Sequence, residues 1–247
     1  MDFLIVANWK MNGSREIAIN YKQTLEKFLA KNIKDNLIIC PPAPYLDILK
    51  SDFYKTGAQD LSAYQFFGSH TGEINAKMLK DLGSSYVIIG HSERRSIEPP
   101  EILRAKISAA QAEGLKVIYC IGETRVQREN GSYITSILKQ IDEVFDSPNK
   151  QTNAANSPCI IAYEPIWAIG SGKVISKEDL QEVSTAIFQH LTKHYQFDSN
   201  DVKLLYGGSV SAENVKNFIN IKQINGLLIG TTSLNCLDII KILEMVC

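Results

Sequence analysis

Residues 162–173 read AYEPIWAIGSGK, and this stretch joins an apolar strand, a carboxylate and a glycine-punctuated loop. Pro165 favours an extended backbone at Glu164, which places the carboxylate at the end of the strand. Beyond it, apolar residues alternate with small ones until two glycines are reached. The pattern predicts a strand-end carboxylate that faces a cleft and a loop that closes over the cleft and expels water. Taken alone, the segment fits equally well an ordinary strand-to-helix connection with one exposed Glu.

Short apolar runs like the one before Glu164 recur along the whole chain. They are mostly continuous in apolar character, which suits strands buried on both faces of a parallel sheet. The runs are FLIVA (3–7), LIICP (37–41), GAQDL (57–61), YVIIG (86–90), VIYCI (117–121), CIIAYE (159–164), KLLYG (203–207) and GLLIG (226–230). With a helix after each strand, they predict an α/β fold, a closed (β/α)8 barrel, as a single domain over residues 1–247.

Helical patterns lie between these runs. Two sets of apolar residues fall at spacings of three and four, so that each set would form one stripe on a helix. The first set is Ile17, Tyr21, Leu25 and Phe28, and the second is Leu180, Val183, Ile187 and Leu191. Ser176 with Asp179 resembles a capping box, and Pro99 with Pro100 suits the first turn of a helix. The polar stretch at 148–158 is expected to be an exposed loop.

A doubly wound open sheet is the competing architecture. It would usually carry a GxGxxG fingerprint after its first strand, whereas here the first strand leads into NWKMNG. In a closed barrel, functional residues gather on the loops at the carboxyl ends of the strands. Candidate site residues are therefore expected on the loops that follow the strands.

Composition limits the partners that the chain can have. The formal net charge is −1 and 21% of residues are charged, which gives no bias toward nucleic acid or acidic membranes. No segment approaches the roughly 18 apolar residues of a membrane span, and no basic leader precedes the first apolar run. The five cysteines form neither CxxC pairs nor an even framework. We expect a cytoplasmic protein with reduced, mostly buried cysteines, no nucleic-acid or membrane partner, and a local anion site.

Several polar residues follow predicted strands and would share one rim of the barrel. Asn8 and Lys10 follow the first strand, His91 follows the fourth, and Glu164 closes the sixth. A lysine held in a cleft attracts an anionic substrate and stabilises negative charge that develops on it. Most lysines are solvated surface residues, so Lys10 alone does not identify a site.

His91 directly precedes SERR, which is a candidate helix start. The partial positive charge at a helix N-terminus disfavours imidazolium, so His91 is expected to be neutral there. A hydrogen-bonded histidine at a strand end, without catalytic function, is the alternative. Glu93 could pair with Lys10, or interact only with Arg94 and Arg95.

Three glycine-rich turns could bind phosphate. Backbone N–H groups at such turns and at helix starts bind anions without adding net charge. The turns are GSGK (170–173), YGGSV (206–210) and GTTS (230–233). The last two follow the seventh and eighth predicted strands, where this barrel fold usually binds phosphate.

Six strings distributed along the chain are, in this order, typical of one family. They are ANWKMNG (7–13), TGEI (71–74), IIGHSERR (88–95), CIGE (120–123), AYEPIWAIGSGK (162–173) and YGGSV (206–210). Together they resemble the triosephosphate isomerase family over nearly the whole chain. The resemblance implies a TIM barrel that interconverts dihydroxyacetone phosphate and glyceraldehyde 3-phosphate without a metal or organic cofactor. It also implies a cytoplasmic homodimer that serves glycolysis, gluconeogenesis and the pentose phosphate shunt.

The same resemblance implies a role for each matching residue. Glu164 would be the catalytic base and His91 a neutral electrophile. Lys10 would bind the substrate, with Asn8 beside it and Glu93 behind it as an orienting partner. Thr71 would lie in a loop that enters a pocket of the partner subunit and supports Lys10. The phosphate would be held by backbone groups of Gly170, Ser171, Ser209, Gly230 and Thr231. The mobile lid would comprise Pro165, Ile166, Trp167, Ala168, Ile169, Gly170, Ser171, Gly172 and Lys173.

This chain departs from the family pattern in three places. Thr231 stands where the family usually has a second glycine, and we expect its φ to stay negative, with the hydroxyl as an added donor. The segment SIEPPEI is shorter than usual, so its helix is expected to start at the prolines, and any role of Glu98 or Glu101 is open. His70 replaces a common aromatic residue, which makes the loop around Thr71 less apolar.

Two other functions remain open at this stage. Another sugar-phosphate isomerase or an aldolase would use a similar barrel, although an aldolase needs a Schiff-base lysine inside a strand, and Lys203 lies only at a strand's beginning. Alternatively, the barrel binds phosphorylated metabolites or a protein partner with weakened or no turnover. Thr231 is the one feature that favours this, while Lys10, His91 and Glu164 argue against it because binding needs no base.

Overall fold

The computed structural model describes residues 3–30, 36–145, 159–195, 197 and 202–246, and in these its strands form one closed parallel barrel. Each strand pairs with the next along the chain, and the last pairs with the first, so the predicted barrel is confirmed. The strands are β1 Leu4–Asn8, β2 Leu37–Cys40, β3 Lys55–Ala58, β4 Tyr86–Ile89, β5 Lys116–Ile121, β6 Cys159–Tyr163, β7 Val202–Tyr206 and β8 Gly226–Ile229.

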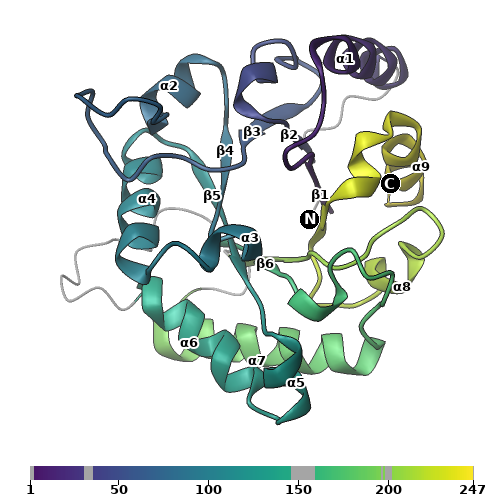
Figure 1. The fold of residues 1–247 in the computed structure, drawn as a ribbon. Helices are drawn as coiled ribbons and strands as arrows, with labels where there is room; N and C mark the ends of the chain where they lie inside the picture. Colours follow the sequence, from purple (N-terminus) through teal and green to yellow (C-terminus); the bar gives the residue numbers. More distant parts are fainter. Residues whose placement is uncertain (1–2, 31–35, 146–158, 196, 198–201, 247) are drawn as a thin grey trace.

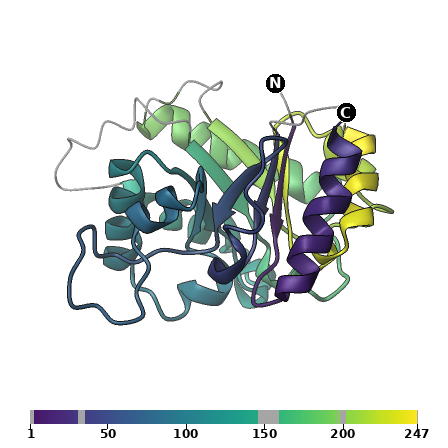
Figure 2. The same ribbon diagram turned by 90° about the horizontal axis from the view of Figure 1, so that it is seen from above.

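Helices surround the strands, which occupy the middle of Figure 1. They are α1 Arg15–Leu29, α2 Ala76–Asp81, α3 Ser92–Arg95, α4 Pro100–Ala112, α5 Arg125–Glu129, α6 Tyr133–Phe145, α7 Lys177–Tyr195, α8 Lys216–Ile219 and α9 Cys236–Val246. Three short 3₁₀ turns complete the described elements: η1 Ala43–Tyr45, η3 Ile166–Ala168 and η4 Thr231–Leu234. In Figures 1 and 2, α1 and α9 lie side by side although they come from opposite ends of the sequence.

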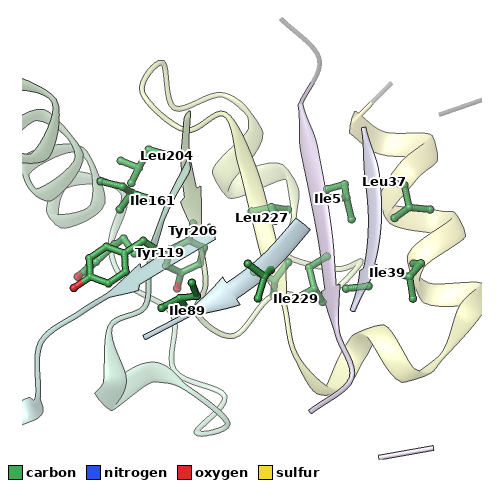
Figure 3. Packing of buried hydrophobic residues seen from close by; sticks show 14 of the residues in the cluster. Ile5, Leu37, Ile39, Ile89, Tyr119, Ile161, Leu204, Tyr206, Leu227 and Ile229 are labelled. Carbon is green, nitrogen blue, oxygen red and sulfur yellow. The ribbon is translucent and has the colours of Figure 1, made fainter. Parts of the chain in front are cut away.

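Side chains alternate between two apolar layers because successive residues of a strand point to opposite faces. In β1, Leu4 and Val6 belong to the smaller cluster inside the barrel. Ile5 and Ala7 belong instead to the larger cluster between strands and helices, part of which is drawn in Figure 3. Both faces of the strands are therefore buried, which explains why the sequence shows continuous apolar runs.

The same alternation brings polar residues to the mouth of the barrel. In β6 the inward residues are Ile160 and Ala162, so the next inward position in the chain is Glu164. By the same count, Asn8 follows Val6 in β1. Asn8 and Glu164 are both buried. The strand pattern therefore places an amide and a carboxylate in the uppermost layer of the interior.

Most local expectations are met. The predicted stripe of α7 is buried, α4 starts at Pro100 after Pro99, and the Ser176 hydroxyl accepts a hydrogen bond from Asp179 N–H at 3.0 Å. Two expectations were wrong. Ile17 is 46% exposed, and the buried face of α1 runs through Ala18, Tyr21, Leu25 and Leu29. The third strand runs from Lys55 to Ala58, so it begins two residues and ends three residues earlier than the GAQDL run suggests. The polar stretch at 148–158 lies outside the described residues.

Candidate active site

A cavity of about 450 Å³ opens at the carboxyl ends of the strands. It brings together most of the predicted site residues, namely Asn8, Lys10, His91, Glu164, Gly170, Ser209, Gly230 and Thr231. Glu93, Ser171 and Thr71 do not line it, and of the predicted lid only Ile169, Gly170 and Gly172 do. Gly207, Gly208, Val210 and Thr232 also line it and belong to the two turns that the sequence indicated for phosphate. Further lining residues that the sequence did not single out as site residues are Ser211, Asn214 and Leu228.

The carboxylate of Glu164 lies against the imidazole of His91 in this cavity. Glu164 is only 3% exposed, and its Oε1 is 3.1 Å from His91 Nε2. Its second oxygen accepts a long hydrogen bond from Ser92 N–H at 3.4 Å. On the opposite side, a Cβ added to Gly207 would come within 2.8 Å of Glu164 Cγ, so only glycine leaves room for this carboxylate. The prediction that Glu164 and His91 share one cleft agrees with this geometry.

The hydrogen bonds of His91 define its tautomer. His91 is the N-cap of α3, and its Nδ1 accepts a hydrogen bond from Glu93 N–H at 3.3 Å. A backbone N–H can only donate, so Nδ1 must keep its lone pair and the ring proton lies on Nε2. His91 Nε2 lies 3.1 Å from Glu164 Oε1. Nε2 is therefore the ring nitrogen that is close to Glu164, in the cavity that His91 lines.

Lys10 has an unusual backbone conformation that three side chains support. Its φ is 54°, and it is the only residue other than glycine with a positive φ in the described part of the chain. Its N–H donates to Asn8 Oδ1 at 3.0 Å, and its carbonyl accepts from Gln59 Nε2 at 2.8 Å. Its Nζ donates to Glu93 Oε1 at 2.6 Å. Left-handed backbone is costly for residues with a Cβ, so these contacts hold the ammonium where it faces the cavity.

Glu93 pairs with Lys10, which resolves the choice that the sequence left open. Partial burial alone would raise the pKa of Glu93, but the hydrogen bond and charge of Lys10 lower it below its usual value. Gln59, by contrast, was missed, because the sequence placed it inside a strand. It follows β3 directly, and its amide also donates to Cys40 O at 2.9 Å.

The turns after β7 and β8 are linked to each other and to the lid. Thr232 Oγ1 donates to Val210 O at 2.7 Å, and Ser209 Oγ donates to Ala168 O at 2.6 Å. Thr231 is the first residue of η4 and does not have a positive φ, as the sequence led us to expect. The hydroxyl of Ser171 points back into the lid, where it donates to Ala168 O at 3.1 Å. Ser171 can therefore reach an anion only through its backbone in this arrangement.

A buried carboxylate anchors the first half of the lid. Trp167 Nε1 donates to Glu123 Oε1 at 2.8 Å, and Glu123 is completely buried. The same oxygen accepts from Tyr163 OH at 3.1 Å and from Arg128 Nε at 2.9 Å. The sequence contains Glu123 in the CIGE string but gives no sign of this contact, because its partners lie on three other elements. The lid tip carries positive φ at Gly170 and Gly172, which only glycine adopts readily.

The shortened segment after α3 leads into a buried ionic cluster. Lys106 is 4% exposed, and its Nζ lies 2.7 Å from both Asp60 Oδ1 and Glu98 Oε1. Arg94 also contacts both carboxylates. Burial raises the pKa of Asp60, although the hydrogen bond from Lys106 opposes the shift. Glu98 therefore has structural ion-pair partners. Glu101 is exposed, and among the described residues its ion pair is with Arg104 at 3.3 Å.

Thr71 lies on an exposed loop that carries large apolar side chains. Phe66 is 78% exposed and Phe67 is 63% exposed. His70 stacks on Tyr64 with 3.6 Å between ring centroids, so the substitution noted in the sequence is accommodated within the loop. Thr71 itself contributes nothing to the cavity wall of its own chain.

Other sites are limited in the described part of the molecule. No three His, Cys, Asp or Glu side chains there are grouped as metal ligands. None of the helices in that part combines the length and apolar character that crossing a membrane requires. Cys40 and Cys120 are buried free thiols, and Cys236 is a partly buried one. Burial, and then the neighbouring Glu164, raises the pKa of Cys120, so this thiol stays neutral beneath the base.

A closed barrel that holds a carboxylate, an imidazole and an ammonium group at one rim belongs to the (β/α)8-barrel enzymes with acid–base sites. Residues 3–246 match the family described as triosephosphate isomerase. Triosephosphate isomerase of Hahella chejuensis is 38% identical over 249 residues, covering 98% of this chain and 97% of that protein. Those of Shewanella sediminis and Shewanella oneidensis are 37% identical over 254 residues, covering 97% of this chain and 95% of each relative. The chain belongs to the triosephosphate isomerase family.

Proposed function

We propose that this chain interconverts dihydroxyacetone phosphate and D-glyceraldehyde 3-phosphate by a 1,2-proton transfer through an enediolate. The contact between Glu164 Oε1 and His91 Nε2 at 3.1 Å carries the proposal. It joins a base and a neutral proton donor in one cavity that Lys10 also lines. Removing a proton next to a carbonyl requires a base, an oxyanion stabiliser and a fixed positive charge, and this cavity offers one of each.

Glu164 is assigned as the base. Its carboxylate takes the proton from the carbon next to the substrate carbonyl. The electron pair of that C–H bond becomes the C=C bond of the enediolate, and the π pair of the carbonyl moves to its oxygen. His91 Nε2–H, whose nitrogen lies 3.1 Å from Glu164 Oε1, donates to the developing oxyanion. The proton then returns from Glu164 to the former carbonyl carbon. The proton of the adjacent hydroxyl moves to the former carbonyl oxygen, so no atom is gained or lost and the substrate and product are isomers.

Lys10 is assigned to substrate binding and Glu93 to its orientation. The ammonium stabilises the negative charge of the substrate and of the enediolate. Asn8 lies beside it in the cavity wall and also accepts the Lys10 N–H. Because the whole chain has a net charge of only −1, attraction of a phosphorylated substrate depends on such local groups.

The phosphate is assigned to the turns after β7 and β8 and to the lid. Backbone groups of Gly170, Ser171, Ser209, Gly230 and Thr231 are the proposed donors. A Cβ added to Gly230 would lie 3.5 Å from Lys10 Cε, so this turn lies beside the ammonium group. When the lid at 165–173 closes, it excludes water from the enediolate and limits elimination of phosphate.

We also propose a cytoplasmic homodimer that acts in glycolysis and gluconeogenesis. The exposed Phe66 and Phe67 beside Thr71 favour a protein partner, since large apolar side chains are seldom left in water on one loop. The partner would be a second copy, with Thr71 supporting Lys10 across the interface. Mass determination by light scattering at several concentrations, with Phe66→Glu as the disrupting variant, tests this. A wild-type protein that stays monomeric at all concentrations contradicts it.

A coupled assay with purified protein and glyceraldehyde 3-phosphate tests the activity. Glu164→Gln should lower kcat by at least about 10²- to 10⁴-fold, the usual contribution of a general base. Circular dichroism should show an unchanged fold, because Gln is nearly isosteric with Glu. Near-normal turnover by this variant contradicts the assignment of Glu164. A wild-type protein that binds triose phosphate without isomerising it would support the alternative of a phosphate-binding barrel.

A further inference from the structure

Gln140, on the outer helix α6, forms a pair of hydrogen bonds with the peptide groups of Gly122. Gly122 N–H donates to Gln140 Oε1 at 2.9 Å, and Gln140 Nε2 donates to Gly122 O at 2.8 Å. The side-chain amide thereby replaces a neighbouring strand at the point where β5 has ended. We propose that Gln140 is a positioning residue that holds the main chain of the base, Glu164, in its reactive place.

Gly122 and Glu164 are in unusually close backbone contact. A Cβ added to Gly122 would lie 1.8 Å from Glu164 O and 2.7 Å from Glu164 C, so only glycine fits there. Directly before this contact, Glu164 N–H donates to Ile121 O at 2.7 Å. Any displacement of the Gly122 peptide is therefore transmitted to the main chain that carries the carboxylate.

Gly207 limits the base on its other side. Gly207 N–H donates to Tyr163 O at 2.8 Å, and a Cβ there would meet Glu164 Cγ. Glu164 thus lies between two glycine backbones, one fixed by β7 and the other fixed by Gln140. Loss of the Gln140 amide would leave the N–H and the carbonyl of Gly122 without these partners. The Gly122 backbone, which is one of the two that confine Glu164, could then move.

Gln140 is itself connected to α3, the helix whose N-terminus His91 caps. Tyr119 OH donates to Gln140 O at 2.8 Å. Arg95, at the end of α3, donates through Nη2 to Tyr119 OH at 3.0 Å and to Cys120 O at 2.6 Å. One set of hydrogen bonds therefore spans α6, β5 and α3, which between them position both the base and the imidazole.

The expected effect of removing the amide is on proton transfer. A displacement on the order of 1 Å can lower a rate by about 10²-fold, so Gln140→Met should lower kcat by roughly 10-fold or more. Inhibition by inorganic phosphate should stay within about twofold of wild type, because the phosphate turns do not contact Gln140. Slower proton transfer should also raise the primary deuterium isotope effect measured with substrate labelled at the transferred position.

Two further variants serve as controls for Gln140→Met. Gln189→Met makes the same substitution at an exposed position of α7 and should leave kcat and the isotope effect unchanged. Gln140→Glu keeps an acceptor for Gly122 N–H but sets a carboxylate against Gly122 O, so it should lower kcat at least as much as Gln140→Met. Should Gln140→Met fail to fold, Gln140→Glu carries the same measurements.

The inference rests on the proposed function, in which Glu164 is the base, and the two can fail separately. Full turnover by Glu164→Gln would overturn the base assignment whatever Gln140 does. A strongly impaired Glu164→Gln together with a Gln140→Met whose kcat matches Gln189→Met would overturn only the role of Gln140. A loss of kcat in Gln140→Met with equally weakened phosphate inhibition and no change in isotope effect would overturn it too, in favour of a general structural effect.

Discussion

Trp167 of the lid donates its indole N–H to the buried carboxylate of Glu123 at 2.8 Å. Glu123 also accepts from Tyr163, which belongs to β6, and from Arg128 of α5. The lid is thus attached to the barrel by a charged hydrogen bond at its first half. Its second half, by contrast, carries the two glycines with positive φ.

Trp167→Phe should weaken closure of the lid. A hydrogen bond to a charged group contributes about 1.5–3 kcal/mol, so kcat/KM should fall by about tenfold or more. A lid that closes less well admits water, so more inorganic phosphate should be released per turnover. Tyr163→Phe is the matched control, since it removes a bond to the same oxygen from a strand instead of the lid. Equal phosphate release by wild type and Trp167→Phe would contradict this role of the indole.

The backbone strain at Lys10 can be measured by comparing two variants. Lys10→Ala and Lys10→Gly both lack the ammonium group and its pair with Glu93, and they differ only in the Cβ. Because φ is 54°, the Gly variant should be more stable than the Ala variant by about 1 kcal/mol. Urea unfolding of both proteins checks this, and an Ala variant as stable as the Gly variant would mean that the left-handed backbone is not strained. Both should have lost most of their activity.

Lys106 should contribute strongly to stability because it lies between the buried carboxylate of Glu98 and the partly buried carboxylate of Asp60. Removing one partner of a buried ion pair costs about 3–5 kcal/mol, which is the loss expected for Lys106→Met in urea unfolding. Arg125→Met on α5 removes an ion pair with Glu129 whose two side chains are both exposed, and it should lower the free energy of unfolding much less. A similar, small loss in both variants would show that Asp60 and Glu98 tolerate each other without the ammonium group.

Thr231→Gly tests whether the threonine fits the phosphate turn. Since the φ of Thr231 is not positive, a glycine gains no conformational advantage there. KM for triose phosphate should therefore stay the same or rise, with Thr231→Ser retaining the hydroxyl as the control. A large fall in KM for Thr231→Gly would mean that the methyl group of threonine obstructs the phosphate.

Much of the fold follows from the sequence because its signal is local. Continuous apolar runs predict the strands, and side-chain alternation within β6 then places Glu164 at the mouth of the barrel. The GAQDL run was misplaced because β3 begins with polar Lys55, which the apolar criterion leaves out. Ile17 was assigned to the wrong face because its spacing also fits the stripe, and only packing shows that Ala18 is the buried residue.

The supporting residues of the site were not predictable in the same way. Gln59, Glu123 and Gln140 act through hydrogen bonds to residues 18 to 49 positions away in the chain. The sequence does not show whether an amide or carboxylate near a strand end is hydrated or forms a hydrogen bond to the backbone of the active site. Only the closed barrel brings the partners together, so these roles appear only in three dimensions.

The pairing of β1 with β8 also has a consequence for synthesis on the ribosome. β1 emerges first and stays an open sheet edge until β8 has been made, and such edges attract other strands. The residues that line the cavity likewise span the sequence from Asn8 to Thr232. A nascent chain therefore cannot form the whole binding site for a triose phosphate before its eighth strand has left the ribosome. Substrate binding therefore cannot stabilise the growing chain. Packing among the strands and helices made first has to prevent misassembly.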